Sequence, residues 1–405
     1  MSALMKLVVL VPCAFFLIAL INFLYDYLWR PPRIQNMLNS QGIKGPPYRF
    51  IHGNNKEVTS MRKEALSKSM GSTDEIFPRV QPHIYSWINR YGKNYLCWNG
   101  NRAELVISEP ELVKEVMRNS EKAFPKAKPS FYVSKLFGNG LVFIEGEKWV
   151  KHRKLSNNAF HGESLKLWKS ADLLESEKLA KEIQDCVMKI VKKREDKVVN
   201  GEADSFGNDF LGLLVKAYQD LNEKKKLSWE DLVDECKTFY FAGQETVNSL
   251  LAWTVLLLAI HGDWQERQEE SPPNGLVRGV EREVQLGKVV LPANIDLLVP
   301  NIALHHDPHF WGDDVHLFKP ERFAEGIAKA TKCNAAAYFP FGLGPRSCVG
   351  MTFATTETKI ALSMILQHYA ITLSPAYVHS PMPIITLQPQ HGIQVILESL
   401  HNNDA

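Results

Sequence analysis

The sequence has few cysteines and no excess of either charge. Its six cysteines are scattered through 405 residues without a C-x-x-C pair, which argues against a disulfide framework or a zinc site and favours a reducing compartment. The 47 lysines and arginines nearly balance the 45 aspartates and glutamates, so the net charge of +2 provides no basic field for nucleic acid. No internal repeat or low-complexity tract is present. What remains is a globular chain long enough for one large domain or two smaller ones.

Long hydrophobic runs are scarce too, with one exception at the N-terminus. Leu7–Leu24 is apolar except for Asn22, and aromatic residues and then arginines follow it as far as Arg33. A run of about 18 residues is enough to cross the hydrocarbon layer of a bilayer. We therefore expect a single membrane-spanning helix, with the rest of the chain on the cytosolic side. A cleaved signal peptide is the alternative, but no small-residue cleavage site precedes the Trp-Arg-Pro-Pro stretch.

The chain divides into an anchor with a stiff hinge at Pro31–Pro32, residues 1–33, and a body, residues 34–405. The body is expected to be mainly α with minor β. Tyr95–Ile107 reads as a hairpin with Asn99–Gly100 as the turn, and two short strands are expected within Val284–Val299.

One helix should be unusually long. Ser228 is a candidate N-cap with Asp231 as an imperfect capping-box partner, and the helix can run to about His261. It is apolar on most faces from Phe239 onward, so we expect it to be buried.

The segment FPFGLGPRSCVG, Phe339–Gly350, places one cysteine among glycines just before a predicted helix. A thiolate at Cys348 would feel the positive end of that helix and nearby backbone N–H groups. The glycines let the backbone pass close to a flat object, and Arg346 can neutralise a carboxylate on it. A soft thiolate in such a loop suits iron as an axial ligand. A buried structural cysteine after a glycine-rich turn is the alternative.

The complete spacing F-x-x-G-x-R-x-C-x-G resembles the signature of the cytochrome P450 superfamily, the haem-thiolate monooxygenases. The resemblance implies that Cys348 is the proximal metal ligand to the iron of haem b (iron protoporphyrin IX). It also implies that Phe341, Gly344, Arg346 and Gly350 of the same loop help to bind this cofactor.

A stretch inside the long helix, Ala242-Gly243-Gln244-Glu245-Thr246, resembles the family's oxygen-binding motif A-G-x-[DE]-T. The resemblance implies cofactor contacts for Ala242 and Gly243, and catalytic roles with oxygen and protons for Thr246 and Glu245. Gly243 permits a local widening of the helix, and Glu245 can connect the site to solvent. Alone the motif is weak, because threonine in a helix usually bonds the preceding turn.

Three further stretches resemble parts of the same family. Trp149–Arg153 resembles W-x-x-x-R, whose i, i+4 spacing puts both side chains on one helix face, where both can donate to a haem propionate. A surface stack of Arg153 on Trp149 is the alternative. Pro320–Phe323 resembles the family's P-E-R-F element, and Lys44–Arg49 resembles the Pro-rich hinge of microsomal members. Two stretches, Leu387–Gly392 and Phe239–Thr246, look most like the plant clan that acts on terpenoids and terpenoid-derived hormones.

The chain departs from the family pattern in one region. Family members of this type are longer and carry an E-x-x-R helix between the oxygen-binding motif and the cysteine loop, whereas no Glu-x-x-Arg occurs here between Thr246 and Phe341. Interruptions near 165–168 and 267–274 suggest internal deletions. Arg322 of the P-E-R-F element would then lose its carboxylate partner, and a buried unpaired charge costs several kcal/mol.

Two functions follow as alternatives. The first is a membrane-anchored monooxygenase of the endoplasmic reticulum. It would insert one oxygen atom from O2 into a hydrophobic small molecule (a terpenoid, hormone or fatty-acid-like compound), with electrons passed from NADPH through a flavoprotein reductase. The second is a truncated, haem-free and inactive membrane-anchored derivative, which the missing E-x-x-R favours. A soluble helical binding module without cofactor would make the cysteine-loop spacing a coincidence.

Overall fold

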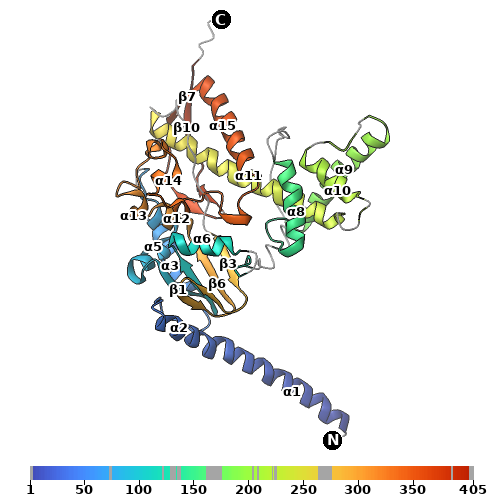
Figure 1. Ribbon diagram of the computed structural model, residues 1–405, viewed down its shortest axis with the longest axis vertical. Helices are drawn as coiled ribbons and strands as arrows, with labels where there is room; N and C mark the ends of the chain where they lie inside the picture. Colours follow the sequence, from blue (N-terminus) through green and yellow to red (C-terminus); the bar gives the residue numbers. More distant parts are fainter. Residues whose placement is uncertain are drawn as a thin grey trace.

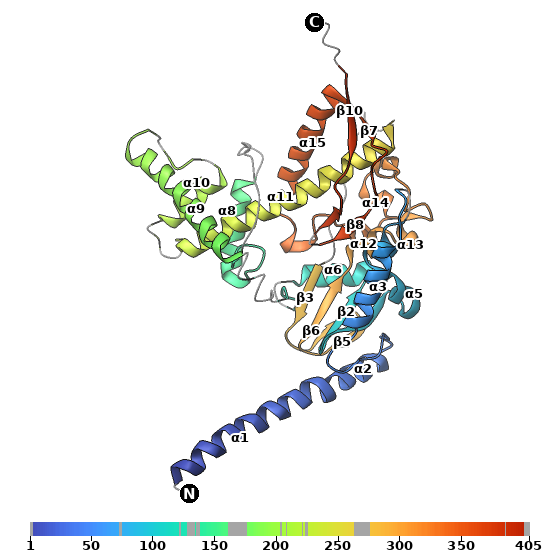
Figure 2. The same ribbon diagram turned by 180° about the vertical axis from the view of Figure 1, so that it is seen from behind.

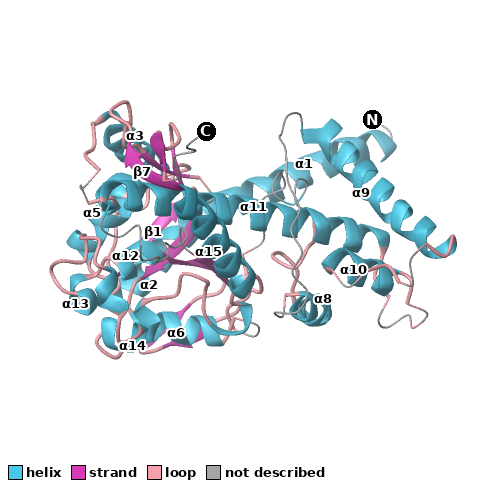
Figure 3. Ribbon diagram, turned by 90° about the horizontal axis from the view of Figure 1, so that it is seen from above, coloured by secondary structure: helices cyan, strands magenta, loops and turns pink. Residues whose placement is uncertain are grey.

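The computed structural model describes residues 3–72, 75–120, 123–127, 134, 138–160, 176–202, 205–207, 209–220, 222, 226–262, 276–384 and 386–400. Figures 1 and 3 show a body that contains the strands and, beside it, an arm of helices; the two are joined by a long helix. The arm consists of α8 (Gly146–Ala159), α9 (Ser176–Val199) and α10 (Phe210–Tyr218), and the joining helix is α11 (Trp229–Ile260). The fold is mainly α with minor β, as expected. The predicted interruptions near 165–168 and 267–274 lie outside the described residues.

The N-terminal apolar run forms α1, Ala3–Leu24, which continues through a π-helical turn, Tyr25–Trp29, into α2, Arg30–Ser40. α1 projects away from the body (Figures 1 and 2). By length and composition, the helical stretch Val11–Ser40 qualifies as a membrane span among the described residues. The predicted hinge at Pro31–Pro32 is wrong. Both prolines occupy the first turn of α2, where a missing N–H is tolerated, so the helix continues through them.

The main sheet has four strands in the order β1-β2-β6-β3. Their bounds are Asn94–Asn99 for β1, Arg102–Ile107 for β2, Ile295–Val299 for β6 and Leu276–Val280 for β3. β1 and β2 form the predicted hairpin, and β6 joins β2 in parallel. The stretch 284–299 holds three strands instead of two, because β4 (Val284–Leu286) and β5 (Val289–Leu291) form their own hairpin around Gly287 before β6 begins.

The two faces of this sheet are covered by different helices. On one face, side chains such as Leu105 and Leu297 pack with Ile34 and Leu38 of α2 and with Val113 of α6 (Pro110–Arg118). On the other face, the aromatic residue Tyr95 packs with apolar side chains of the short helices α4 and α5. The helices on that side are α3 (Asn55–Ser67), α4 (Phe77–Val80) and α5 (Pro82–Tyr91). Successive side chains of β1 and β2 point to opposite faces of the sheet, so both strands contribute to the apolar core on each face.

Helix α11 begins and ends where the sequence predicts. The hydroxyl of Ser228 accepts from the N–H of Asp231 (3.1 Å), the carboxylate of Asp231 accepts from the N–H of Ser228 (3.5 Å), and His261 is the C-cap. The expectation that the helix is buried from Phe239 onward is wrong in part. Tyr240 is 55% exposed and Thr246 is exposed, because this stretch connects the arm to the body (Figure 3).

The C-terminal part supplies short helices and then one long one. The helices are α12 (Asn301–His305), α13 (Pro308–Trp311), α14 (Ile327–Ala330) and α15 (Met351–His368), with 3₁₀ turns at Pro320–Phe323, Ala335–Ala337 and Gly344–Arg346. Two small antiparallel pairs complete the body: β7 (Tyr369–Leu373) with β10 (Val395–Ser399), and β8 (Pro381–Pro383) with β9 (Leu387–Pro389). The cysteine loop lies directly before α15, as predicted.

Candidate functional site

The cysteine loop folds back on itself and is pressed against α6. The N–H of Cys348 donates to the carbonyl of Phe341 (2.7 Å), which closes the loop. Gly344 has a φ of +77°, and a Cβ at this position would lie 2.5 Å from the carbonyl oxygen of Met117 in α6. Only glycine fits both constraints without a shift of the backbone.

The thiol of Cys348 is exposed and sits beside the start of α15. A Cβ on Gly350 would lie 3.9 Å from Sγ, so the backbone at this helix start is close to the sulfur. Partial desolvation by the surrounding protein raises the pKa of Cys348, while the N–H of Gly350 and the charge of Arg153 act to lower it. The predicted stabilisation of the thiolate is therefore present, but desolvation outweighs it.

Helix α8 meets the loop through the two residues of the W-x-x-x-R stretch. The guanidinium of Arg346 stacks on the ring of Trp149, 4.0 Å from its centroid. Nη1 of Arg153 donates to the carbonyl of Ser347 (2.6 Å). Trp149 and Arg153 thus share a face, as predicted, and both contact the cysteine loop. The arginine on Trp149 is Arg346, so the alternative of a surface stack with Arg153 is not what the structure shows.

Arg346 is held by further contacts at the start of α8. Its side chain is 1% exposed, Nη1 donates to the carbonyl of Ile144 (2.8 Å), and Nη2 pairs with Glu145 (2.9 Å). The other carboxylate oxygen of Glu145 accepts from the backbone N–H of Lys126 (3.1 Å). One carboxylate thus joins the cysteine loop, α8 and the segment that contains Lys126.

Lys126 and Arg278 are site candidates that sequence reasoning missed. Arg278 belongs to β3, and Lys126 pairs with it in an antiparallel bridge; neither segment carries a recognisable motif. Arg278 is 3% exposed, and within the described chain its Nε has no hydrogen-bond partner. Burial and the nearby charge of Arg346 lower the pKa of Arg278. Burial, together with Arg278 and Arg346, also lowers the pKa of half-buried Lys126 to about 7.

These side chains form a cation cluster, defined as Lys126, Arg278 and Arg346, with Glu145 as its only carboxylate among the described interactions. Glu145 pairs with Arg346, so the other two basic side chains, Lys126 and Arg278, bond only to neutral groups among the described interactions, Val142 and Val277 among them. A ligand that carries two carboxylates suits this arrangement, since charge-assisted hydrogen bonds are strongest where water is excluded.

The A-G-x-E-T stretch lies in an unbroken α-helix. The hydroxyl of Thr246 donates to the carbonyl of Ala242 (2.7 Å), which is the ordinary bond to the preceding turn. A Cβ on Gly243 would meet nothing within 4 Å, and the described helix shows no local widening there. The catalytic and cofactor roles of these residues stay predictions.

Glu245 bonds the start of β9 and the residue just before it. Its Oε1 accepts from Thr386 (3.0 Å) and from Gln388 (2.6 Å). One and two turns later, Ser249 bonds Thr386 (2.8 Å), and Trp253 donates to the carbonyl of Leu387 (2.6 Å). Glu245 therefore belongs to a polar stripe that fixes α11 to the C-terminal strands, a contact that the sequence did not predict.

Helix α11 also reaches the cysteine loop through apolar packing. Phe239 of α11 and Val349 of the loop both pack on a cluster formed by Leu141, Ile144 and Trp149. This cluster lies one turn before Ala242. It brings α8, α11 and the loop together, and none of the residues 242–246 of the predicted oxygen motif belongs to it.

A buried pair between α8 and α11 is a second feature that the sequence did not reveal. Nδ1 of His152 lies 2.6 Å from Oε1 of Glu235, and their side chains are 2% and 1% exposed. Burial raises the pKa of Glu235, while the bond to His152 opposes the rise. One turn earlier, Lys148 pairs with Asp231 at a more exposed position. The pairs share i, i+4 spacing on both helices, a signal visible in sequence only when the two helices are known to be neighbours.

The expectation that Arg322 lacks a carboxylate partner is wrong. Nη1 donates to the carbonyl of Trp311 (2.6 Å) and to Asp314 (3.1 Å), and Nη2 also bonds Asp314. Its side chain is 14% exposed. A nearby aspartate on the same loop thus neutralises the charge without an E-x-x-R helix.

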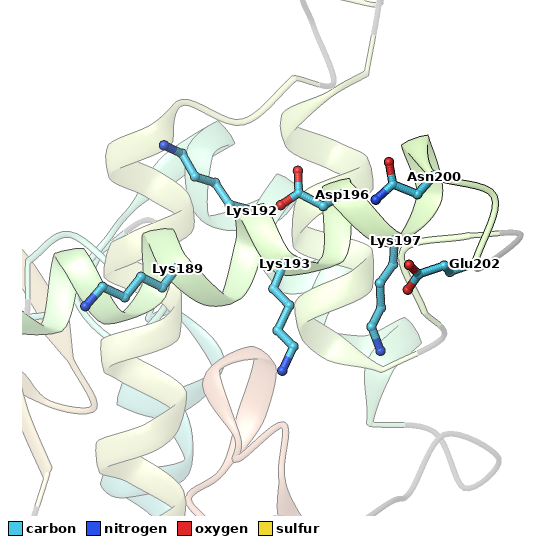
Figure 4. Close-up of a pocket in the computed structure, with 7 residues that line it drawn as sticks. All are labelled: Lys189, Lys192, Lys193, Asp196, Lys197, Asn200 and Glu202. Carbon is cyan, nitrogen blue, oxygen red and sulfur yellow. The ribbon is translucent and has the colours of Figure 1, made fainter.

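A cavity of about 380 Å³ lies on α9, away from these groups in sequence. Figure 4 shows its lining side chains on α9 and on the turn that follows it: Lys189, Lys192, Lys193, Asp196, Lys197, Asn200 and Glu202. No residue of the predicted site lines it. Lysines mixed with acidic side chains on an outer helix are typical of a solvated face.

Comparisons with known proteins agree on one family. The family model described as Cytochrome P450 matches residues 79–177, 164–271 and 267–397. Cytochrome P450 CYP749A22 of Panax ginseng is 43% identical over 502 aligned positions, covering 96% of each chain. The 7-deoxyloganic acid hydroxylase of Catharanthus roseus is 31% identical (93% of this chain, 95% of that one). The 11-oxo-beta-amyrin 30-oxidase of Glycyrrhiza uralensis is 33% identical (92% and 94%).

A solved structure shares the fold. Retinoic acid bound cyanobacterial CYP120A1 superposes with a TM-score of 0.64 at 19% sequence identity, covering 80% of this chain and 96% of that one.

The buried pair allows a test of how α8 is held on α11. Glu235→Ala leaves His152 buried without its acceptor, so we expect the free energy of unfolding to fall by about 2–3 kcal/mol. Lys148→Ala removes the exposed neighbouring pair and should cost less than about 1 kcal/mol. Urea unfolding of the detergent-solubilised chain measures both. Equal losses for the two variants would contradict the assignment.

The lowered pKa of Lys126 predicts a pH dependence. Below pH 7 the lysine is protonated in both the folded and the unfolded state. Burial of this charge then destabilises the folded state. Between about 7 and the usual value of 10.5 only the unfolded state holds it, so stability rises with pH. Lys126→Met removes this group. The variant should therefore exceed the unaltered chain in thermal midpoint at pH 6, and the difference should shrink at pH 9. A difference that grows with pH would refute the assignment.

Proposed function

The chain belongs to the cytochrome P450 family of monooxygenases, and we propose that it inserts one oxygen atom from O2 into a terpenoid-like substrate. Two relatives support this substrate class, since their names give 7-deoxyloganic acid and 11-oxo-beta-amyrin as the molecules that they oxidise. Hormones derived from terpenoids and fatty-acid-like molecules are the other hydrophobic substrates that suit this family.

The observation that carries the proposal is the fit between the cation cluster and a haem. Haem b has two propionates, and the cluster offers two basic side chains, Lys126 and Arg278, beyond the Arg346 that pairs with Glu145. The buried Nε of Arg278, without a partner in the described chain, is a donor that a propionate would satisfy. Cys348 lies in the same loop as Arg346, so one short segment contributes both the iron ligand and a propionate contact.

Each protein group then has a defined task. Cys348 would hold the iron, and Trp149, Arg153, Arg278, Arg346 and Lys126 would surround or neutralise the propionates. When bound, the haem supplies the activation of O2. Thr246 would orient oxygen through its hydroxyl, and Glu245 would pass protons after releasing Thr386 or Gln388. The exposed position of Thr246 supports access of small molecules to this turn of α11.

We further propose that electrons come from an NADPH-dependent flavoprotein reductase and that the body lies on the cytosolic side of the endoplasmic reticulum membrane. The apolar, exposed helix α1 supports the anchor. The resemblance to microsomal members supports the reductase and the compartment.

A second candidate is the haem-free derivative, and one observation favours it. The family match divides into three segments that meet at 164–177 and 267–271, beside the predicted interruptions. The alignment with the ginseng relative runs over 502 positions, more than the 405 residues present here. Missing helices would leave the haem pocket open to water on part of its wall, which weakens retention of an apolar cofactor.

The reduced, carbon-monoxide-bound absorption spectrum separates the two candidates. The full chain expressed with haem supply should show a strongly red-shifted Soret band, because a thiolate ligand increases electron density at the iron. Cys348→Ser should lose the red shift, whereas the exposed cysteine variant Cys333→Ser should keep it. Well-folded protein without haem absorbance would favour the inactive derivative.

Haem retention tests the cation cluster separately. Arg278→Leu should raise the apparent Kd for haem about 10-fold or more, since a charge-assisted hydrogen bond is worth roughly 1.5–3 kcal/mol. Arg102→Leu removes an arginine that is 57% exposed on β2 of the same sheet, two strands away, and should leave the Kd unchanged. Transfer of haem to apomyoglobin measures both. Equal haem loss from both variants would rule out a specific contact at Arg278.

A further inference from the structure

A buried histidine, His305, bonds the backbone at the point where the cysteine loop begins. It is the last residue of α12 and is 8% exposed. Its Nε2 accepts from the N–H of Phe339, the first residue of the loop (3.2 Å). Its ring centroid lies 5.3 Å from that of Phe339 and 5.1 Å from that of Tyr338. His305 and Phe339 are 34 positions apart in the sequence, so only the fold brings them together.

The imidazole of His305 is neutral, and only one of its two nitrogens has a partner. Burial, and then the neighbouring His306, lower the pKa of His305 to about 3. Because Nε2 accepts a hydrogen bond, the ring proton lies on Nδ1, which has no partner among the described residues. A buried donor without a partner costs free energy, so an apolar side chain would fill this space more favourably. The bond to Phe339 is therefore what distinguishes histidine from a packing residue here.

Hydrogen bonds continue from Phe339 through the loop to Cys348. The side chain of Phe339 is 2% exposed and belongs to the main core with Leu304. The carbonyl of Phe339 accepts from the N–H of Gly342 (2.9 Å). The carbonyl of Phe341 accepts from the N–H of Cys348 (2.7 Å). A shift of Phe339 would therefore move the turn that determines where the sulfur lies.

Helix α12 is a fixed base for this histidine. The indole N–H of Trp311 donates to the carbonyl of Leu304, the residue before His305 (3.0 Å). The carbonyl of Trp311 in turn accepts from Arg322 (2.6 Å). The ring of Tyr338 lies between the others, with its centroid 5.1 Å from that of His305 and 5.5 Å from that of Trp311. An acceptor that is held in this way keeps its partner N–H at a defined place.

We propose that His305 is a positioning residue for Cys348, because its bond to the N–H of Phe339 fixes the start of the loop that carries the sulfur. The inference rests on the proposed function, which assigns Cys348 to the iron of a haem. His305 would touch neither the iron nor the haem and would act only through the loop. Groups that orient a metal ligand from behind are worth about 10- to 100-fold in the strength of a metal site.

Two amide variants distinguish a positioning role from simple packing. In His305→Gln the side-chain oxygen reaches the place of Nε2 and can still accept from Phe339. In His305→Asn the oxygen lies at the level of Nδ1 and is too far from Phe339. The two variants carry the same polar group and differ by one methylene. His306→Asn is the matched control, because His306 is the next residue, is half-buried and bonds no loop residue among the described interactions.

Amide hydrogen exchange of the full chain without haem is the first measurement. In His305→Asn the N–H groups of Phe339 and Cys348 should exchange about fivefold faster than in the unaltered chain, because a bond that holds the loop is lost. In His305→Gln and His306→Asn they should exchange at the unaltered rate. Equal exchange in His305→Asn and His305→Gln would overturn the proposal.

The absorption spectrum of the reduced, carbon-monoxide-bound protein is the second measurement. Among molecules that contain haem, the ratio of red-shifted to unshifted Soret absorbance should fall about tenfold in His305→Asn. The ratio should be unchanged in His305→Gln and His306→Asn. An equal fall in His306→Asn would indicate a general loss of the fold and would contradict the positioning role. A fall in His305→Gln would also contradict it, even if His305→Asn does not fold.

The two measurements together separate this inference from the proposed function. Faster exchange in His305→Asn with an unchanged Soret ratio would mean that the bond holds the loop but does not position the iron ligand, which overturns the inference alone. No haem absorbance in the unaltered chain would overturn the proposed function and, with it, the role of His305 toward iron. Faster exchange in His305→Asn would then leave the residue only a role in folding of the loop.

Discussion

Positive charge that the protein does not neutralise is the constraint around which the candidate site is organised. Lys126, Arg278 and Arg346 come from three segments far apart in the sequence, and Glu145 is the carboxylate between them. One carboxylate oxygen of Glu145 accepts a hydrogen bond from the backbone N–H of Lys126, and the other pairs with Arg346. Glu145 therefore holds two residues of like charge near one another. A dianionic haem would relieve their repulsion. The excess of basic side chains in the cluster and the family assignment therefore point to the same ligand.

The long helix α11 connects the candidate site to the rest of the molecule. At its start the buried pair of His152 and Glu235 fixes α8, which carries the two residues that contact the cysteine loop. Further along, Glu245 bonds the start of β9 and the residue just before it. These contacts join α8, α11, the cysteine loop and the C-terminal strands directly to one another, so they do not require further helices. Arg322 illustrates the same tolerance, because Asp314 takes the place of a more distant carboxylate.

Local sequence patterns were sufficient for several elements and for the family. The apolar run predicted α1, the Ser228 cap predicted the start of α11, and the cysteine loop predicted both the family and its place before α15. These features depend on neighbours within a few residues or on an exact spacing, which a sequence displays directly. The Pro31–Pro32 hinge was predicted wrongly, because proline in the first turn of a helix does not break it.

Tertiary structure decided what those patterns could not. Lys126 and Arg278 have no motif, and only the bridge beside β3 brings them to Arg346. His305 likewise meets the start of the cysteine loop only through the packing of α12 against it. By itself the sequence determined the family, the cysteine expected to bind iron in that family and the apolar N-terminal helix. Each of these can be recognised from a short contiguous stretch of residues. Which charges share a site follows only from long-range packing, because it depends on residues that are far apart in the sequence.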